Sequence, residues 1–172
     1  PKSSVAVDAA RAKVGADPGT IDHWAELGYA LIDAEGWIDA WNVSEEIEKR
    51  VPGHPDGLVV GAMVRIAMGQ ADRAAELLDK ALVASPNHLM GLTYRGMLAA
   101  QTGDLEGATR HWEKARDLSP DPQDKVAFDE LLARAQDGTI PSAAGPAGHP
   151  GGAGHPPAEG SSTPAPASPG TS

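Results

Sequence analysis

The sequence predicts an all-α solenoid of three full helix–turn–helix repeats, each 34 residues long. The first observation is that proline recurs at a constant spacing, as Pro18, Pro52, Pro86 and Pro120. The second is that three further positions keep the same register, as Ala40, Ala74 and Ala108, as Gly28, Ala62 and Gly96, and as Trp24, Leu58 and Leu92. A fixed period of this length indicates stacked helical hairpins.

Taken in order, the chain predicts a capping helix, three repeats and a second capping helix. Residues 5–16 are rich in helix formers and end at a turn containing Pro18. The repeats cover about residues 21–54, 55–88 and 89–122, and a last helix covers about 124–136. The folded domain is therefore expected over 5–137. Residues 141–172 are rich in Pro, Gly, Ala and Ser, and we expect them to be disordered.

Small residues inside the repeats have specific roles. We expect Gly28 and Ala40 to be small because the two helices of a repeat cross closely at these positions. Gly69 and Gly103 take corresponding places in the turns between helices, where glycine permits a positive φ at low steric cost.

The charge of the chain argues against two classes of partner. The net charge is −10, and the only ionised side chain expected after residue 140 is Glu159, so the repeats carry nearly all of it. An acidic repeat domain lacks the basic face that nucleic acid requires, and it gains nothing near an anionic lipid surface. We therefore expect no nucleic-acid partner and no membrane contact from this chain.

The first repeat carries a family pattern in Trp24, Leu27, Gly28, Leu31, Ala40 and Pro52. With these residues the chain resembles the tetratricopeptide repeat (TPR) family over residues 5–137. Arg65 and Arg95 depart from that pattern, because they stand where the family usually has apolar side chains. The resemblance implies a non-enzymatic protein–protein interaction module in which the first helix of each repeat lines a concave groove.

Carried over by repeat position, this resemblance implies a peptide-binding groove that is mostly apolar. Its candidate residues are Ala25, Tyr29, Ile32, Val59, Val60, Met63, Ile66, Met90, Tyr94 and Met97. The basic clamp with which other TPR domains hold a chaperone carboxylate is missing here. We therefore expect an apolar peptide or an amphipathic helix as the partner, with methionine adapting to its shape. We expect Met63→Glu to abolish binding without loss of helicity.

Within the family, the chain is similar to the periplasmic TPR domain of a bacterial cytochrome c maturation factor. The similarity rests on the helix that ends at Ala16-Asp17-Pro18, on the three compact repeats and on the final segment Leu131-Leu132-Ala133-Arg134. It implies that the partner is an apocytochrome c and that the chain is periplasmic, tethered by an upstream anchor. The alternatives are a self-assembling TPR scaffold or a subunit of a secretion or assembly complex, and a cytoplasmic location.

The sequence offers no candidate for catalysis, for a cofactor or for a metal site. There is no cysteine, no phosphate-binding loop and no Gly-x-Ser-x-Gly motif. Histidines occur singly, as His23, His54, His88 and His111 in the repeats and as His149 and His155 near the end, without the spacing of metal ligands. We expect a chain that is not an enzyme and that uses no cofactor.

Overall fold

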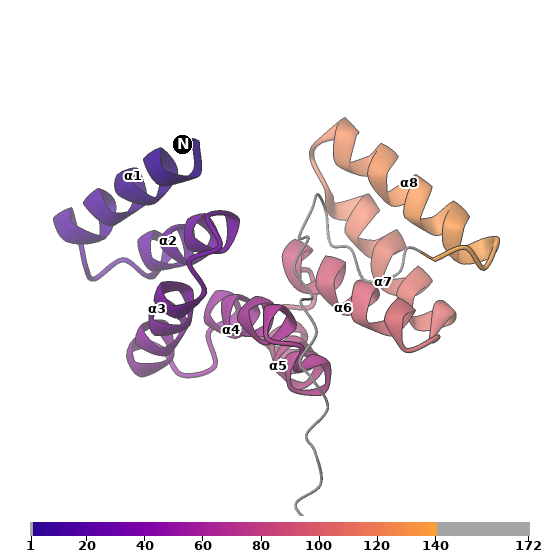
Figure 1. The fold of residues 1–172 in the computed structure, drawn as a ribbon, viewed down its shortest axis with the longest axis horizontal. Coiled ribbons are helices and arrows are strands. Elements are labelled where there is room, and N and C mark those ends of the chain that lie inside the picture. Colours follow the sequence, from indigo (N-terminus) through magenta and orange to yellow (C-terminus); the bar gives the residue numbers. More distant parts are fainter. Residues whose placement is uncertain (1, 141–172) are drawn as a thin grey trace, which may run out of the picture. The chain divides into compact units, whose positions relative to one another are not determined.

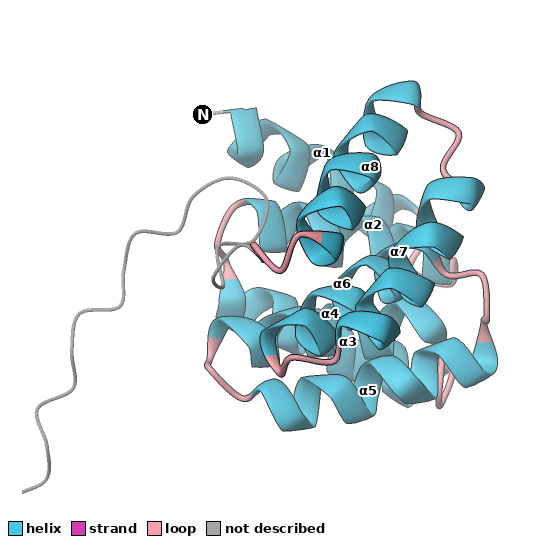
Figure 2. Ribbon diagram, turned by 90° about the vertical axis from the view of Figure 1, so that its right-hand side faces the viewer, coloured by secondary structure: helices cyan, strands magenta, loops and turns pink. Residues whose placement is uncertain are grey.

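The computed structural model describes residues 2–140, which form eight α-helices and no strand (Figures 1 and 2). The helices are α1 (Lys2–Ala16), α2 (Ile21–Asp33), α3 (Trp37–Arg50), α4 (Pro55–Ala67), α5 (Ala71–Ala84), α6 (Leu89–Gln101), α7 (Leu105–Leu118) and α8 (Pro122–Gln136). None of the helices in this part of the chain is long and apolar enough to span a bilayer. The predicted disordered segment, 141–172, lies outside the described residues.

The helices stack in chain order as three hairpins with a helix at each end. Helices α2 and α3, α4 and α5, and α6 and α7 form the hairpins, while α1 packs on α2 and α8 on α7. The first helices of successive repeats also touch, α2 against α4 and α4 against α6. The predicted all-α solenoid with two capping helices is therefore confirmed.

The capping helices begin earlier than predicted. Helix α8 begins at Pro122, because proline fits the first helical turn, where its missing N–H would have no partner in any case. Asp121 caps this helix by accepting a hydrogen bond from the backbone N–H of Gln123 at 2.8 Å. Helix α1 begins at Lys2.

Close helix crossings explain the small residues that recur in the sequence. Ala40, Ala74 and Ala108 have no exposed surface. A Cβ on Gly28 would lie 2.9 Å from Val60 of α4 and 3.3 Å from Val43 of α3. Gly28 therefore lets α2 approach the second helix of its own repeat and also the first helix of the next, as a larger residue would not.

The turns inside the three hairpins share one backbone conformation. Gly69 and Gly103 have φ values of 72° and 82°, as expected from their position in the sequence. The equivalent residue of the first repeat is Glu35, which adopts φ 58° without being glycine. The first hairpin thus places an ordinary side chain in the left-handed region, at a cost that glycine avoids in the other two.

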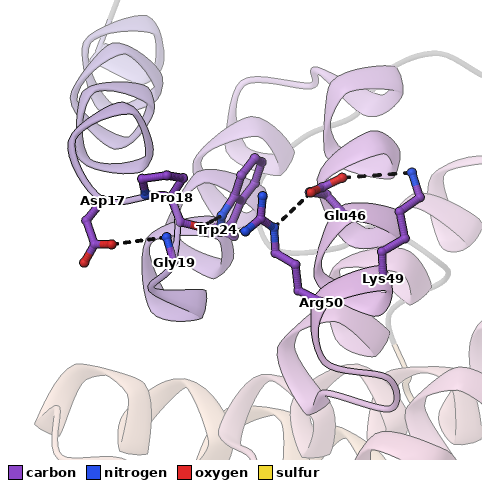
Figure 3. A network of polar contacts seen from close by, with 7 residues as sticks. All are labelled: Asp17, Pro18, Gly19, Trp24, Glu46, Lys49 and Arg50. Carbon is purple, nitrogen blue, oxygen red and sulfur yellow. Dashed lines mark hydrogen bonds and ion pairs between the residues drawn. The ribbon is translucent and has the colours of Figure 1, made fainter.

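A shared backbone carbonyl fastens the N-terminal cap to the first repeat (Figure 3). The carbonyl of Pro18 accepts hydrogen bonds from Trp24 Nε1 at 2.9 Å and from Arg50 Nη1 at 2.8 Å. The guanidinium of Arg50 also lies over the Trp24 ring, 4.9 Å from its centroid, and Arg50 Nε bonds Glu46 at 2.9 Å. The turn after α1 is therefore held by both helices of the first repeat.

The buried side chains form two clusters rather than one. The first cluster runs from α1 to α5 and includes Leu98 of α6. The second belongs to α6, α7 and α8, with Trp112 and Phe128 as its largest members. Helix α6 contributes to both, so it joins the two clusters.

Candidate functional site

Five of the ten predicted groove residues are buried in this structure, and their role in binding stays a prediction. These five are Ala25, Ile32, Val59, Val60 and Met63. Val59 and Val60 have no exposed surface at all, and Val60 fills the space beside Gly28. Of the five, Ile32, Val59, Val60 and Met63 belong to the first core cluster, where α2 and α4 pack together. Met63 is 5% exposed, so we expect Met63→Glu to bury a carboxylate and destabilise the fold as well, while its effect on binding stays a prediction.

The other five predicted residues keep part of their surface exposed. They are Tyr29, Ile66, Met90, Tyr94 and Met97. All except Met97 pack on the first core cluster, while Met97 packs on the second. Together with Asp56, these five residues are called the first-helix face below. Their role in binding stays a prediction.

A hydrogen-bonded chain across three helices orders this face. Asp56, in the first turn of α4, accepts a hydrogen bond at Oδ1 from the hydroxyl of Tyr29 in α2 at 2.8 Å. The same oxygen lies 2.9 Å from Nε2 of His88, the residue that precedes α6. One carboxylate oxygen thus connects the first helices of all three repeats.

The cap of α6 fixes which nitrogen of His88 carries the proton. His88 Nδ1 accepts a hydrogen bond from the backbone N–H of Gly91 at 3.1 Å, which caps the helix. An accepting Nδ1 leaves the proton on Nε2, so Nε2 donates to Asp56. His54 acts in the same way one repeat earlier, where Nδ1 accepts from the N–H of Asp56 at 3.3 Å and caps α4.

These two histidine caps were not foreseen from the sequence. His54 and His88 share one repeat register just before a first helix. That register is the N-cap position, which was the available signal. The structure therefore gives the repetition a helix-capping role. Among residues 2–140, no group of three or more His, Asp or Glu side chains is arranged to hold a metal ion.

The hydrogen bonds among Tyr29, Asp56 and His88 shift the pKa values of Asp56 and Tyr29 in opposite directions. The bond from His88 lowers the pKa of Asp56, and the bond from Tyr29 adds to this effect against the opposing effect of burial. Burial and the nearby Asp56 carboxylate raise the pKa of Tyr29. Burial and Asp33 raise the pKa of Tyr94 as well. Near neutral pH the first-helix face thus holds one charged carboxylate, Asp56, and two neutral phenols, Tyr29 and Tyr94.

The two arginines that departed from the family pattern are directed toward second helices. The guanidinium of Arg65 lies over the ring of Trp41 in α3, 4.4 Å from its centroid, and it also bonds Gln70. Arg95 Nε donates to Asp79 of α5 at 2.6 Å. Both side chains therefore replace an apolar contact between helices by a stacked or ionic one.

Comparisons with known proteins support the fold, and they say less about the function. No family model matches the chain. A human protein described as FK506-binding protein-like is 36% identical over 83 residues, which is 46% of this chain. The chain spans only 23% of the length of that relative.

Solved structures match a larger share of the chain. The structure of MamA superposes with a TM-score of 0.57 at 15% identity, covering 77% of this chain and 75% of that one. The TPR2B domain of yeast Sti1, solved in a complex with pHsp70, gives a TM-score of 0.57 at 16% identity, covering 69% of this chain and 97% of that one. The fold is therefore a TPR-type solenoid.

Proposed function

We propose that the chain is a non-enzymatic interaction module that binds an apolar peptide or an amphipathic helix on its first-helix face. The observation that carries this proposal is the partial exposure of Tyr29, Met90 and Tyr94. Tyr29 lies on α2 of the first repeat, Met90 and Tyr94 lie on α6 of the third, and all three pack on one core cluster. Aromatic and methionine side chains of this kind provide contact area that adapts to a partner's shape.

The electrostatics of the face support the same proposal. Tyr29 and Tyr94 stay neutral because burial raises the pKa of each hydroxyl. A neutral phenol offers an apolar ring with a polar edge, which suits a partner with both kinds of surface. The fold class supports it further, since the Sti1 TPR2B domain was solved in a complex with pHsp70.

The test uses a fluorescently labelled amphipathic peptide of about 18 residues with leucine at helical spacing. We expect the chain to bind it, and Tyr94→Glu and Met90→Glu each to weaken binding by about tenfold or more, because a charge replaces apolar contact. The matched control is Val83→Glu on α5, where the side chain is 84% exposed. Binding that is absent in the wild-type chain, or equally weakened by the control, contradicts the proposal.

A narrower form of the proposal identifies the partner as the C-terminal amphipathic helix of an apocytochrome c, with a periplasmic location. Its support is the sequence resemblance carried by the turn at Pro18 and by the segment Leu131–Arg134. We expect a peptide of such a helix to bind about tenfold more tightly than its scrambled version. Equal affinities would contradict the narrower form and leave the broader one in place.

A further inference from the structure

The first helices of the first two repeats carry acidic side chains, and the arginines of the first helices are engaged by other side chains. Helices α2 and α4 carry Asp22, Asp33 and Asp56, while a fourth carboxylate, that of Glu26, is paired with Lys13 of α1 at 2.7 Å. The two arginines of the first helices, Arg65 and Arg95, are engaged by Trp41 and Gln70 and by Asp79 as described above. The free charge beside the partly exposed Tyr29 and Tyr94 is therefore negative.

Among these carboxylates, Asp56 belongs to the first-helix face and has its orientation fixed by hydrogen bonds. Its Oδ1 is held from two sides, by Tyr29 and by His88. No described residue donates a hydrogen bond to Oδ2. The nearest candidate is His54 Nδ1 at 3.7 Å, and that nitrogen already accepts the N–H of Asp56. The side chain of Asp56 is 26% exposed, so a partner can reach it.

The fixed orientation and the free Oδ2 of Asp56 favour binding of a cationic group. Two donors fix its orientation, so little conformational entropy is lost when a third group binds. The low pKa of the carboxyl keeps it charged at any pH near neutral. The Asp56 side chain is only 26% exposed, and this partial exclusion of water strengthens an ion pair relative to one on an open surface.

We propose that Asp56 anchors a lysine or arginine side chain of the bound segment, so that the first-helix face selects a cationic amphipathic helix. This inference rests on the proposed peptide-binding function and names the chemistry of its partner. The apolar side of the helix would lie on Tyr29, Met90 and Tyr94, with its cationic flank toward Asp56 and Asp33. The segment 141–172 of this chain does not fit that description, because it contains no lysine, no arginine and no large apolar residue.

The experiment uses three synthetic peptides of about 18 residues that share one leucine face. Their polar flank carries lysine, glutamine or glutamate, and affinity is measured by fluorescence anisotropy. We expect the lysine peptide to bind most tightly. Asp56→Asn should weaken binding of this peptide by about five- to tenfold and leave the glutamine peptide within about twofold.

The control variant is Asp72→Asn, which removes the same charge from the same place in a helix. Asp72 is the second residue of α5, as Asp56 is the second residue of α4. It is exposed and belongs to a second helix. An equal loss of lysine-peptide affinity in both variants would mean that only the overall negative charge matters, and it would overturn the anchoring role.

The outcomes separate this inference from the function on which it rests. If the lysine and glutamine peptides bind equally and Asp56→Asn changes neither, the anchor is refuted while peptide binding stands. If none of the peptides binds, the proposed function fails. A measurement on the wild-type chain covers the case in which Asp56→Asn does not fold. The carbon-13 resonance of the Asp56 carboxyl should shift with the lysine peptide and not with the glutamine peptide, and equal shifts would contradict the anchor.

Discussion

The indole of Trp112 in α7 occupies the space that a side chain on Gly96 of α6 would need. A Cβ on Gly96 would lie 2.5 Å from Trp112 Nε1 and 2.6 Å from Cδ1. Trp112 is 2% exposed, and its Nε1 donates to the carbonyl of Thr93 at 3.2 Å, so the ring cannot easily withdraw. The contact fixes how closely the two helices of the third repeat approach.

Gly96→Ala should therefore destabilise the protein although alanine is the better helix former. We expect the free energy of unfolding in urea to fall by about 1–2 kcal/mol, because the overpacking cost exceeds the gain in helix propensity. Gly15→Ala in α1 is the matched control, since no neighbouring atom lies within 4 Å of its Cβ position. That change should raise stability by up to about 1 kcal/mol. A change in the free energy of unfolding of the same sign in both variants would contradict the steric explanation.

Replacing a turn glycine should cost stability only through its backbone conformation, because a new side chain there meets no neighbour. Nothing lies within 4 Å of a Cβ added at Gly69, whose φ is 72°. Gly69→Ala should lower the free energy of unfolding by about 1 kcal/mol because alanine disfavours this region. Gly69→Asn should lose less, since asparagine tolerates a left-handed backbone. Chemical denaturation of both variants checks the order, and a greater loss with asparagine would contradict it.

Asp56 should make the stability of the fold depend on acidity. Its pKa in the folded chain is below the value of 3.8 expected without these contacts, chiefly because of the bond from His88. A depressed pKa contributes stability that is complete above the unfolded pKa and is lost as the pH falls through the folded pKa. The gap in unfolding free energy between wild type and Asp56→Asn should thus narrow below about pH 4. Urea titrations across this range measure it, and a constant gap would contradict the assignment.

The Arg50 contacts predict that lysine is a poor replacement at this position. Arg50→Lys loses the planar group over Trp24 and weakens the bonds to Pro18 and Glu46. We expect a loss of about 0.5–1 kcal/mol in the free energy of unfolding. Lys49→Arg, next along the helix, should stay within about 0.5 kcal/mol of wild type. Thermal and urea unfolding compare the pair, and equal effects would rule out a special role for the guanidinium.

The fold could be predicted because its main determinants repeat in the sequence. The 34-residue spacing of proline and of small residues such as Ala40 and Gly28 reports contacts within a repeat and between neighbouring repeats. Positive φ at Gly69 and Gly103 follows from their place in the turns. Each of these features depends on a few nearby residues, and a sequence pattern records them directly.

The surface of the candidate site depends on distances that the pattern does not contain. Repeat position alone placed Val60 in the predicted groove, and it does not reveal that Val60 packs beside Gly28 with no exposed surface. The bond between His88 and Asp56 joins residues 32 positions apart through side-chain conformations. The sequence shows that Arg65 departs from the pattern, but its stacking on Trp41 could be recognised only in the structure.

The division of the buried side chains into two clusters has a consequence for how the molecule opens. Helices α7 and α8 belong to the second cluster alone, so their amides should exchange with solvent through a partial unfolding that leaves α1 to α5 intact. Helix α6 belongs to both clusters and carries Met90 and Tyr94. A partner that grips α2, α4 and α6 together would oppose that partial unfolding, since it binds only the closed form. As more of the first-helix face is occupied by the partner, the solenoid would then unfold more cooperatively. Slower hydrogen exchange in α7 and α8 would report this binding, although neither helix contributes to the bound surface.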